Sequence, residues 1–116
     1  MKQVIIIRKD LKVRNKGKMI SQGAHAAMSF LLKGQSTEED IIEWLNGGQT
    51  KVCLSVNSEE ELLELDRKAK EMGLISNIIT DEGRTEFNFV PTKTCLAIGP
   101  NKIEDINAIT GQLKLY

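Results

Sequence analysis

The sequence predicts an α/β fold in a single domain, with helices layered against one sheet. Its 116 residues suit one domain. Short runs rich in Val, Ile and Leu alternate with segments in which apolar residues recur at helical spacing. The helical segments are long enough to connect strands by crossovers. Because 41% of the residues are hydrophobic and 28% are charged, the composition also argues against a disordered chain.

The first predicted elements are a strand and a long helix. Residues 3–8 form a Val/Ile run typical of a buried strand, and a polar, basic loop follows over residues 10–17. Residues 18–33 have helical periodicity, and Gly34 ends this helix. The predicted core-facing residues of the helix are Ile20, Ala24, Ala27, Met28 and Leu31.

Two capping-box patterns begin the next two helices. Ser36-Thr37-Glu38-Glu39 begins a short helix, and Ser58-Glu59-Glu60-Glu61 begins a longer one that stops at Gly73. Between these helices, residues 51–56 form the second predicted strand. The predicted buried residues of the longer helix are Leu62, Leu65, Ala69 and Met72.

The last third of the chain contains two more strands and a helix. Residues 74–80 and 94–98 are the predicted strands, and an irregular loop over residues 81–93 separates them. Asn101 is the expected N-cap of the final helix. A short apolar tail at residues 113–116 follows this helix. The predicted order is therefore strand, helix, helix, strand, helix, strand, strand, helix.

Composition indicates a soluble protein of the cytoplasm. The longest strongly apolar run, residues 4–7, is far too short to span a bilayer, and no signal peptide is evident. Cys53 and Cys95 both fall in apolar strand-like runs, so both are expected to be buried, reduced thiols. With a single histidine in the chain, a structural zinc site is not expected.

The net charge is zero, yet the charges are unevenly distributed. Residues 1–33 carry a net charge of +7, whereas residues 34–66 carry −8. A basic face on a neutral protein attracts phosphate, so nucleic acid is one candidate partner. The alternative is that both charged blocks are solvated surface.

One stripe of polar side chains lies along the first long helix. At about 100° per residue, Lys18, Gln22, His25 and Ser29 fall within roughly 60° of one another, nearly opposite the predicted apolar face. The stripe begins at the helix N-terminus, where free backbone N–H groups suit an anion. A solvent-exposed polar face, with His25 as a bystander, explains the same pattern.

A second candidate site lies in the loop after the third predicted strand. Asp81 follows that strand, and ligands of α/β sheets bind outside the carboxyl ends of strands. Gly83 permits a tight turn or a close approach to a ligand. The alternative is an ordinary polar turn, although thirteen residues are long for a plain connection.

Several common catalytic motifs are absent from the sequence. It contains no dinucleotide-binding glycine motif, Walker loop, HExxH, CxxC or G-x-S-x-G pattern. A cysteine–histidine nucleophile pair would require His25 to meet one of two cysteines that are expected to be buried.

Five ordered blocks together cover almost the whole chain. The first is the segment Lys16-Gly17-Lys18-Met19-Ile20-Ser21-Gln22-Gly23-Ala24-His25-Ala26-Ala27, with Arg8-Lys9-Asp10-Leu11-Lys12 before it. The others are Gly48-Gln49-Thr50-Lys51-Val52 after Trp44, Asp81-Glu82-Gly83-Arg84-Thr85, Leu96-Ala97-Ile98-Gly99-Pro100, and Thr110-Gly111-Gln112-Leu113-Lys114-Leu115-Tyr116. In this order, the blocks resemble those of the type 2 (archaeal and eukaryotic-type) peptidyl-tRNA hydrolase family.

The resemblance implies a fold and a reaction. The implied fold is an α/β/α layered sandwich over residues 1–116, with a four-stranded mixed sheet flanked by helices, often as a homodimer. The implied reaction hydrolyses the ester that joins a peptide, or an N-blocked amino acid, to the terminal ribose of tRNA, without a metal or an organic cofactor. The implied site residues are Lys18, Gln22, His25, Asp81, Thr85 and Thr94.

Two positions depart from the family pattern. Glu82 stands where the family usually has a small residue, and Pro91-Thr92 stands where it usually has Pro-Gly. Both positions flank the implied site, so they concern substrate geometry more than the fold.

The residues suggest a hypothesis for ester hydrolysis by water. Asp81 orients or deprotonates the attacking water, with Thr85 or Thr94 holding it, and Lys18 stabilises the oxyanion or holds the terminal phosphate. Gln22 and His25 position the end of the substrate. Three loop bases are expected to contact the tRNA backbone, namely Lys12, Arg14 and Lys16.

Two other functions fit parts of the sequence. A non-catalytic RNA-binding module of the same fold would not need Lys18 and Asp81. A hydrolase of another acyl ester or amide, without RNA, would not need the basic first third of the chain.

Overall fold

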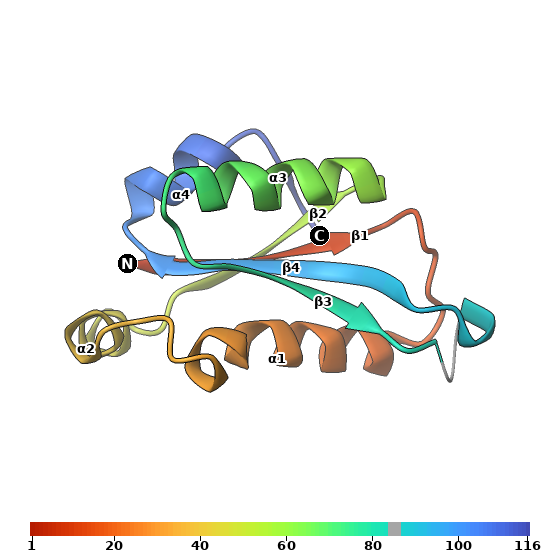
Figure 1. Cartoon of the computed structure of the whole chain (residues 1–116), viewed down its shortest axis with the longest axis horizontal. Coiled ribbons are helices and arrows are strands. Elements are labelled where there is room, and N and C mark those ends of the chain that lie inside the picture. The colour runs from red at the N-terminus through yellow and green to blue at the C-terminus, as the bar shows by residue number, and fades with distance from the viewer. Residues whose placement is uncertain (84–86) are drawn as a thin grey trace.

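The computed structural model of the chain describes residues 1–83 and 87–116. It contains four helices and one sheet (Figure 1). The helices are α1 (Lys16–Leu32), α2 (Glu38–Asn46), α3 (Glu59–Glu71) and α4 (Ile103–Thr110). The strands are β1 (Lys2–Arg8), β2 (Lys51–Val56), β3 (Ser76–Asp81), β4 (Thr92–Asn101) and β5 (Lys114–Leu115), and a single 3₁₀ turn (Phe87–Phe89) precedes β4.

The predicted helices are all present, and side-chain caps fix the start of three of them. Asn15, Thr37 and Ser58 accept hydrogen bonds from the backbone N–H groups of Lys18, Asp40 and Glu61, respectively. The predicted N-cap of the last helix was wrong: Lys102 occupies that position and makes no side-chain cap. Asn101 instead accepts a hydrogen bond from the backbone N–H of Ile75 at 3.0 Å and so joins β4 to the chain before β3.

The sheet is mixed, with strand order β3-β4-β1-β2-β5. β1 and β2 are parallel, whereas all other neighbours are antiparallel. The expectation of four strands was wrong, because residues of the predicted apolar tail form β5 beside β2. The backbone N–H of Tyr116 also bonds to the carbonyl of Cys53 at 3.0 Å. β5 covers part of an edge that β2 would otherwise leave open.

The two strands around the candidate site differ in length from the prediction. β3 begins at Ser76 and includes Asp81, and β4 extends from Thr92 to Asn101. The irregular loop between them is therefore shorter than the predicted residues 81–93. Pairing of Asp81 with Thr92 at the end of the ladder accounts for both extensions.

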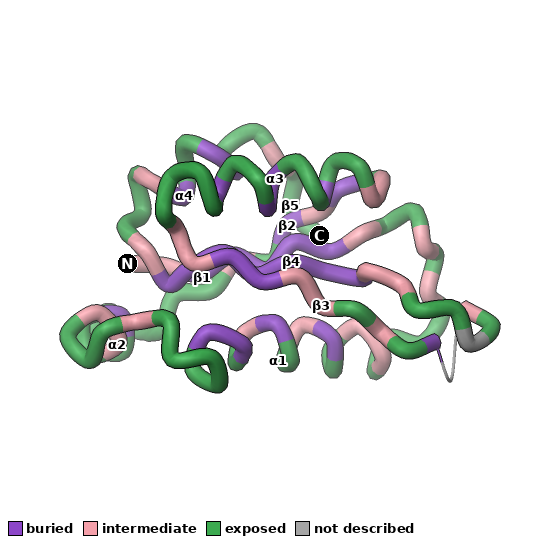
Figure 2. The backbone as a smooth tube through the Cα atoms, in the orientation of Figure 1, coloured by how far each residue is buried: buried purple, intermediate pink, exposed green. Residues whose placement is uncertain are grey.

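Helices cover both faces of the sheet: α1 and α2 lie on one side, and α3 and α4 on the other (Figure 1). Buried residues line the strands and the inward sides of the helices (Figure 2). The core on the α3 side consists of large aliphatic residues from strands and helices, among them Val4, Ile6, Leu62, Leu65, Leu96 and Ile106. The core on the α1 side is smaller and consists of Ile5, Ile7, Ala26, Cys95 and Ala97.

The predicted apolar face of α1 was wrong for four of its five residues. Ile20 is 73% exposed and Met28 is 52% exposed, and Ala24 and Leu31 are also exposed, whereas Ala27 is half-buried and packs against the core. α1 buries Gln22, Ala26, Ser29 and Phe30 instead. The small side chains of Ala26, Cys95 and Ala97 let α1 approach β4 closely. The polar stripe therefore faces the sheet, where its buried members find hydrogen-bond partners.

Three further expectations about burial can be compared with the structure. Met72 is exposed, since α3 ends at Glu71 and Met72 lies beyond its packed part. Cys53 is also exposed, contrary to the prediction, whereas Cys95 is buried as predicted. Within the described residues, no helix is both long and apolar enough to cross a membrane.

Candidate active site

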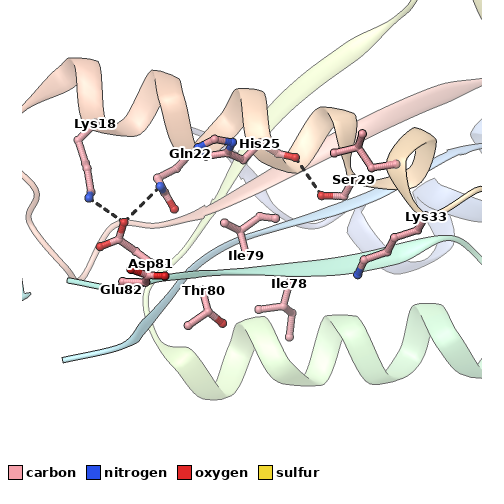
Figure 3. A pocket seen from close by; sticks show the side chains of 11 residues that line it. Lys18, Gln22, His25, Ser29, Lys33, Ile78, Ile79, Thr80, Asp81 and Glu82 are labelled. Atoms are coloured by element: carbon pink, nitrogen blue, oxygen red, sulfur yellow. Dashed lines mark hydrogen bonds and ion pairs between the residues drawn. The ribbon is translucent and has the colours of Figure 1, made fainter. Parts of the chain in front are cut away.

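The first polar residues of α1 meet the carboxyl end of β3. Lys18 in the first turn of α1 and Asp81 at the end of β3 form an ion pair, with 2.7 Å between Lys18 Nζ and Asp81 Oδ1 (Figure 3). Their side chains are only 14% and 12% exposed, so water screens the pair much less than a surface ion pair. The structure thus brings together the two candidate segments that sequence analysis identified separately.

Both carboxylate oxygens of Asp81 accept hydrogen bonds. Oδ1 accepts from Lys18 and, at 3.5 Å, from Nε2 of Gln22, while Oδ2 accepts from the backbone N–H of Gly83 at 2.7 Å. The hydrogen bond from Lys18 is the main cause that lowers the pKa of Asp81, and the Gly83 amide adds to it, although burial acts in the opposite direction. Asp81 is therefore an ionised, well-oriented acceptor at neutral pH.

Gln22 is held in a fixed orientation by Thr94. The Thr94 hydroxyl on β4 is fully buried and donates to Oε1 of Gln22 at 2.6 Å. Because Oε1 is occupied in this way, the Nε2 group of Gln22 points to Asp81. Thr94 lies behind Gln22 rather than on the surface of the cleft, so it contributes by positioning Gln22.

A cleft of about 620 Å³ runs between α1 and β3. Lys18, Gln22, His25 and Ser29 all line it, so the prediction that these four residues share one helix face is confirmed. A second hollow of about 520 Å³ continues past the ion pair toward Asn15, Gly17 and Ser21. Lys18, Gln22, His25 and Asp81 line both hollows, so the ion pair lies where they meet.

His25 and Ser29 differ in their surroundings. His25 is exposed at the mouth of the cleft, whereas Ser29 is buried and donates to the backbone carbonyl of His25 at 2.9 Å. His25 is therefore accessible to a substrate that enters from either hollow.

The three predicted tRNA-binding bases lie at the start of α1: Lys12 and Arg14 are in the loop that leads into the helix, and Lys16 is its first residue. Lys12, Arg14 and Lys16 are all exposed. Their loop lies at the same end of the molecule as the carboxyl end of β3 (Figure 1). The structure thus leaves these charges accessible near the ion pair.

Two further positions of the segment Asp81–Thr85 were singled out in the sequence, namely Glu82 and Thr85. Thr85 lies outside the described residues. Glu82 is exposed and lines the cleft beside Asp81. The unusual carboxylate at position 82 is therefore accessible from the site.

Sequence analysis missed the far end of the cleft. Lys33 lines this end, and its Nζ donates to Oδ1 of Asn77 on β3 at 3.0 Å. Gln35 also exchanges hydrogen bonds with Asn77, at 2.7 and 3.3 Å. Asn77 falls inside the predicted third strand directly before Ile78 and Ile79, and a polar residue buried there needs hydrogen-bond partners, which is a signal that could have pointed to this position.

Cys95 is unsuited to nucleophilic chemistry. It is fully buried beside α1, its Sγ donates to the carbonyl of Gln22 at 3.5 Å, and burial raises its pKa to about 11. Cys53 is exposed on β2, whereas the candidate site lies between α1 and β3. Across residues 1–83 and 87–116, no group of three His, Cys, Asp or Glu side chains gathers that could hold a metal ion.

Comparison with known proteins identifies the family. The model of the family described as peptidyl-tRNA hydrolase PTH2 matches residues 1–116. A peptidyl-tRNA hydrolase from Methanocaldococcus jannaschii is 47% identical over 116 residues, with 99% of each chain covered. Another from Methanopyrus kandleri is 45% identical over 114 residues, with 98% of this chain and 97% of that one covered.

A solved structure of a protein of unknown function from Agrobacterium shares the fold. It superposes with a TM-score of 0.59, covers 99% of this chain and 96% of its own, and is 14% identical. At that identity the likeness concerns the fold alone. The family match over residues 1–116, together with relatives that are nearly half identical, shows that this chain belongs to the peptidyl-tRNA hydrolase PTH2 family.

Proposed function

We propose that Lys18 and Asp81 form the catalytic centre of this hydrolase. The chain hydrolyses the ester bond between a peptide, or an N-blocked amino acid, and the 3′-terminal ribose of tRNA. The observation that supports the proposed centre is the mostly buried ion pair between the two residues, which lies where two open hollows meet. We also propose that residues 1–116 form one peptidyl-tRNA hydrolase domain.

In the proposed reaction, water attacks the ester carbonyl carbon. Asp81 accepts a hydrogen bond from this water and holds it for the attack. Because the pKa of Asp81 is lowered, its carboxylate is a weak base, so its main contribution is to orient the water and to receive its proton as the new bond forms. Asp81 then gives this proton to the 3′-oxygen as the ester C–O bond breaks, and the new carboxylic acid loses its remaining proton to solvent, which yields a free peptide carboxylate and tRNA.

Lys18 stabilises the negative charge that develops on the carbonyl oxygen. Its ammonium group is already placed in the site by Asp81 and by the start of α1, so little reorganisation is needed during the reaction. The same group is also suited to a terminal phosphate of the tRNA. Within the proposal, Gln22 and His25 position the end of the substrate, and Thr94 acts through Gln22. Thr85 remains a predicted participant in holding the water.

The basic loop supplies affinity for the tRNA backbone in this proposal. Lys12, Arg14 and Lys16 are exposed, and lysine and arginine contacts to phosphates do not depend on base sequence. This property suits an enzyme that must process many different tRNAs.

We further propose a homodimer that acts in the cytoplasm without a cofactor. The homodimer is supported by exposed apolar side chains on α1 and α2 outside the cleft, namely Ile20, Met28, Leu31, Ile42 and Leu45. Translation places the peptidyl-tRNA substrate in the cytoplasm, which supports the location.

One assay tests the function. Purified protein is incubated with N-acetyl-aminoacyl-tRNA, ester release is followed, and tRNA binding is measured in parallel. We expect both hydrolysis and salt-sensitive binding. Binding without hydrolysis would indicate a non-catalytic RNA-binding module, and equal hydrolysis of simple acyl esters that lack tRNA would indicate an esterase without RNA.

A further inference from the structure

We infer that the free edge of β3 binds the peptide part of the substrate as an added strand, parallel to β3. This inference rests on the proposed catalytic centre at Lys18 and Asp81. The β3 edge receives the peptide, and the contact consists of main-chain hydrogen bonds.

Among the described residues, β3 is an edge strand whose outer side pairs with no other strand. It is the first strand in the order β3-β4-β1-β2-β5, so β4 is its neighbour in the described sheet. The carbonyl of Ile75, just before β3, accepts from the N–H of Gly99 on β4, and the carbonyl of Ile79 accepts from the hydroxyl of Thr94 on β4. Main-chain groups alternate in direction along a strand, so those of Ile78 and Thr80 point away from β4.

These outward groups are available for pairing. Within the described part of the chain, no hydrogen bond reaches the main chain of Ile78 or Thr80 from the open side of β3. Thr80 is exposed, and Ile78 is only half-buried. Unpaired N–H and C=O groups at such an edge are a template for another strand.

The open edge lies inside the active-site cleft. Ile78, Ile79 and Thr80 form the β3 side of the cleft, which leads directly to Asp81 (Figure 3). The opposite side is α1, where Leu32 is 79% exposed and Lys33 marks the far end. A chain that leaves the catalytic pair along this cleft must therefore run beside β3.

The two edges of the sheet differ in whether another strand or a blocking residue covers them. At the other edge, β5 pairs with Leu54 and Ser55 of β2. The β3 edge carries neither a proline nor a lysine between Ser76 and Asp81. Exposed edges are usually blocked by such residues, so an unblocked edge beside a catalytic pair favours a binding role.

Strand addition also matches the chemistry of the substrate. A hydrolase that frees tRNA from interrupted peptides meets peptides of any sequence, and main-chain hydrogen bonds do not depend on sequence. The open cleft and the apolar surfaces of Leu32 and Ile78 accept side chains of many kinds.

The position of the ester fixes the direction of the peptide. The C-terminal carbonyl of the peptide must lie at Asp81, which is the carboxyl end of β3. The peptide therefore runs in the same direction as β3, with its upstream residues toward Lys33. At about 3.3 Å per residue, Ile78 to Asp81 spans about 10 Å, which accommodates roughly three or four peptide residues.

Binding can be tested independently of catalysis. The probes are tRNA analogues that carry one to four amino acids through a non-hydrolysable 3′-amide, with equilibrium Kd measured for each. We expect Kd to fall with each added residue up to about four, and N-methylation of alternate peptide amides to weaken binding by roughly 2- to 10-fold per lost hydrogen bond. N-methylation of the intervening amides has little effect. A Kd independent of peptide length, or an effect of N-methylation without alternation, overturns the inference.

A matched pair of variants tests the strand itself. Thr80→Pro removes an outward N–H from the β3 edge, whereas Thr80→Ala keeps it. We expect the ratio of Kd between one-residue and four-residue analogues to shrink by roughly 2- to 10-fold in Thr80→Pro and to stay as in the wild type in Thr80→Ala. Equal ratios in the two variants contradict a main-chain contact at Thr80. Near-ultraviolet circular dichroism and the Kd of the one-residue analogue report whether Thr80→Pro remains folded. If the variant does not fold, N-methylation of the substrate analogue tests the same main-chain hydrogen bond in the wild-type protein.

Two other outcomes have distinct meanings. A wild-type protein that hydrolyses N-acetyl-aminoacyl-tRNA but shows no dependence on peptide length refutes the strand inference and leaves the proposed centre standing. A wild-type protein that binds longer analogues more tightly but hydrolyses none of the esters refutes the proposed centre alone. If two copies of the chain pair through their β3 edges, Thr80→Pro changes the molar mass in solution and peptide length has no effect, which also overturns the inference.

Discussion

Helices α3 and α1 pack on opposite faces of the same sheet but bury different kinds of side chain. α3 buries Leu62, Leu65 and Ala69, as its apolar spacing predicts. Its buried Asp66 accepts hydrogen bonds from the Ser76 hydroxyl and from Lys70. On α1, by contrast, the polar Gln22 and Ser29 lie among the buried residues, while Ile20 and Leu31 remain exposed.

The packing residues beneath the two helices explain this contrast. Large aliphatic side chains fill the α3 side, whereas Ala26, Cys95 and Ala97 keep the α1 side thin. The thin layer brings Gln22 within 2.6 Å of Thr94 and places Lys18 against Asp81. The α3 face therefore mainly contributes stability, whereas the α1 face contributes the geometry of the site.

The largest effect is expected for Asp81→Asn. This change keeps the size of the side chain but removes the charge and basicity that act on the water, so kcat should fall by roughly 10³-fold with little change in KM. Glu82→Ala is the comparison, since Glu82 is exposed in the same cleft, and it should change kcat little. Steady-state hydrolysis of N-acetyl-aminoacyl-tRNA measures both. A larger kcat defect in Glu82→Ala would move the acid–base role to that neighbouring residue.

Lys18→Ala should lower turnover by roughly 10²-fold or more, as expected for the loss of an electrostatic stabiliser. The hydrogen bond from Lys18 is the main cause that lowers the pKa of Asp81, so the acidic limb of the kcat/KM profile should also move to higher pH. Lys68→Ala on the exposed side of α3 is the matched control. Near-normal turnover in Lys18→Ala, or an unmoved acidic limb, argues against the proposed role.

Leu62→Ala tests the stabilising face. Leu62 is fully buried under α3, so its truncation should cost about 2–5 kcal/mol in the free energy of unfolding while kcat is retained in the folded protein. Leu63→Ala on the outer side of α3 should change stability by only about 0.5 kcal/mol, because Leu63 is exposed. Urea denaturation of the two variants provides the measurement. Equal losses would mean that burial of Leu62 under α3 contributes no special stability.

Removal of the loop bases should affect binding more than chemistry. In the triple variant Lys12→Ala, Arg14→Ala, Lys16→Ala, KM should rise more than kcat falls, and the salt slope of tRNA binding should drop by roughly two to three units. The control is the triple variant Lys68→Ala, Lys102→Ala, Lys114→Ala. It loses the same charge at other places on the surface, because all three lysines are exposed. An identical response in the two triple variants would mean that only net charge matters.

The smallest effects are expected for the two thiols. Cys95→Ser should cost about 1 kcal/mol of stability because Cys95 is buried, and Cys53→Ser should cost less because Cys53 is exposed. Activity should persist in the double variant. A thermal denaturation curve first confirms that the variant is folded, and ester release is then measured on the folded protein. A folded but inactive double variant would instead indicate a cysteine nucleophile.

The sequence predicted the elements whose signals are local. Caps, apolar runs and glycine stops located the helices and four of the five strands, because each depends on a few consecutive residues. β5 was missed because two residues are too few to show a strand pattern. The exposure of Cys53 was missed because it depends on how far α1 and α2 extend over the sheet, a feature of the tertiary structure.

The candidate site was predictable where it followed simple geometric rules. Helical spacing identified Lys18, Gln22 and His25, and the rule that ligands bind at strand ends identified Asp81. The burial of the polar stripe was not predictable, because apolar residues on the other side of α1 gave the stronger local signal for burial. The free β3 edge could be recognised only from the strand order, which no local pattern encodes.

The strand order has a consequence for the synthesis of the chain. β1 (Lys2–Arg8) pairs on one side with β4 (Thr92–Asn101), so these two partner strands are synthesised far apart in time. Until β4 has been synthesised, β3 has no partner strand and Gln22 has no Thr94. Long-range pairing of this kind delays folding until both strands exist. A nascent chain that has not reached residue 92 therefore cannot yet hold Asp81 and Gln22 in the geometry of the site.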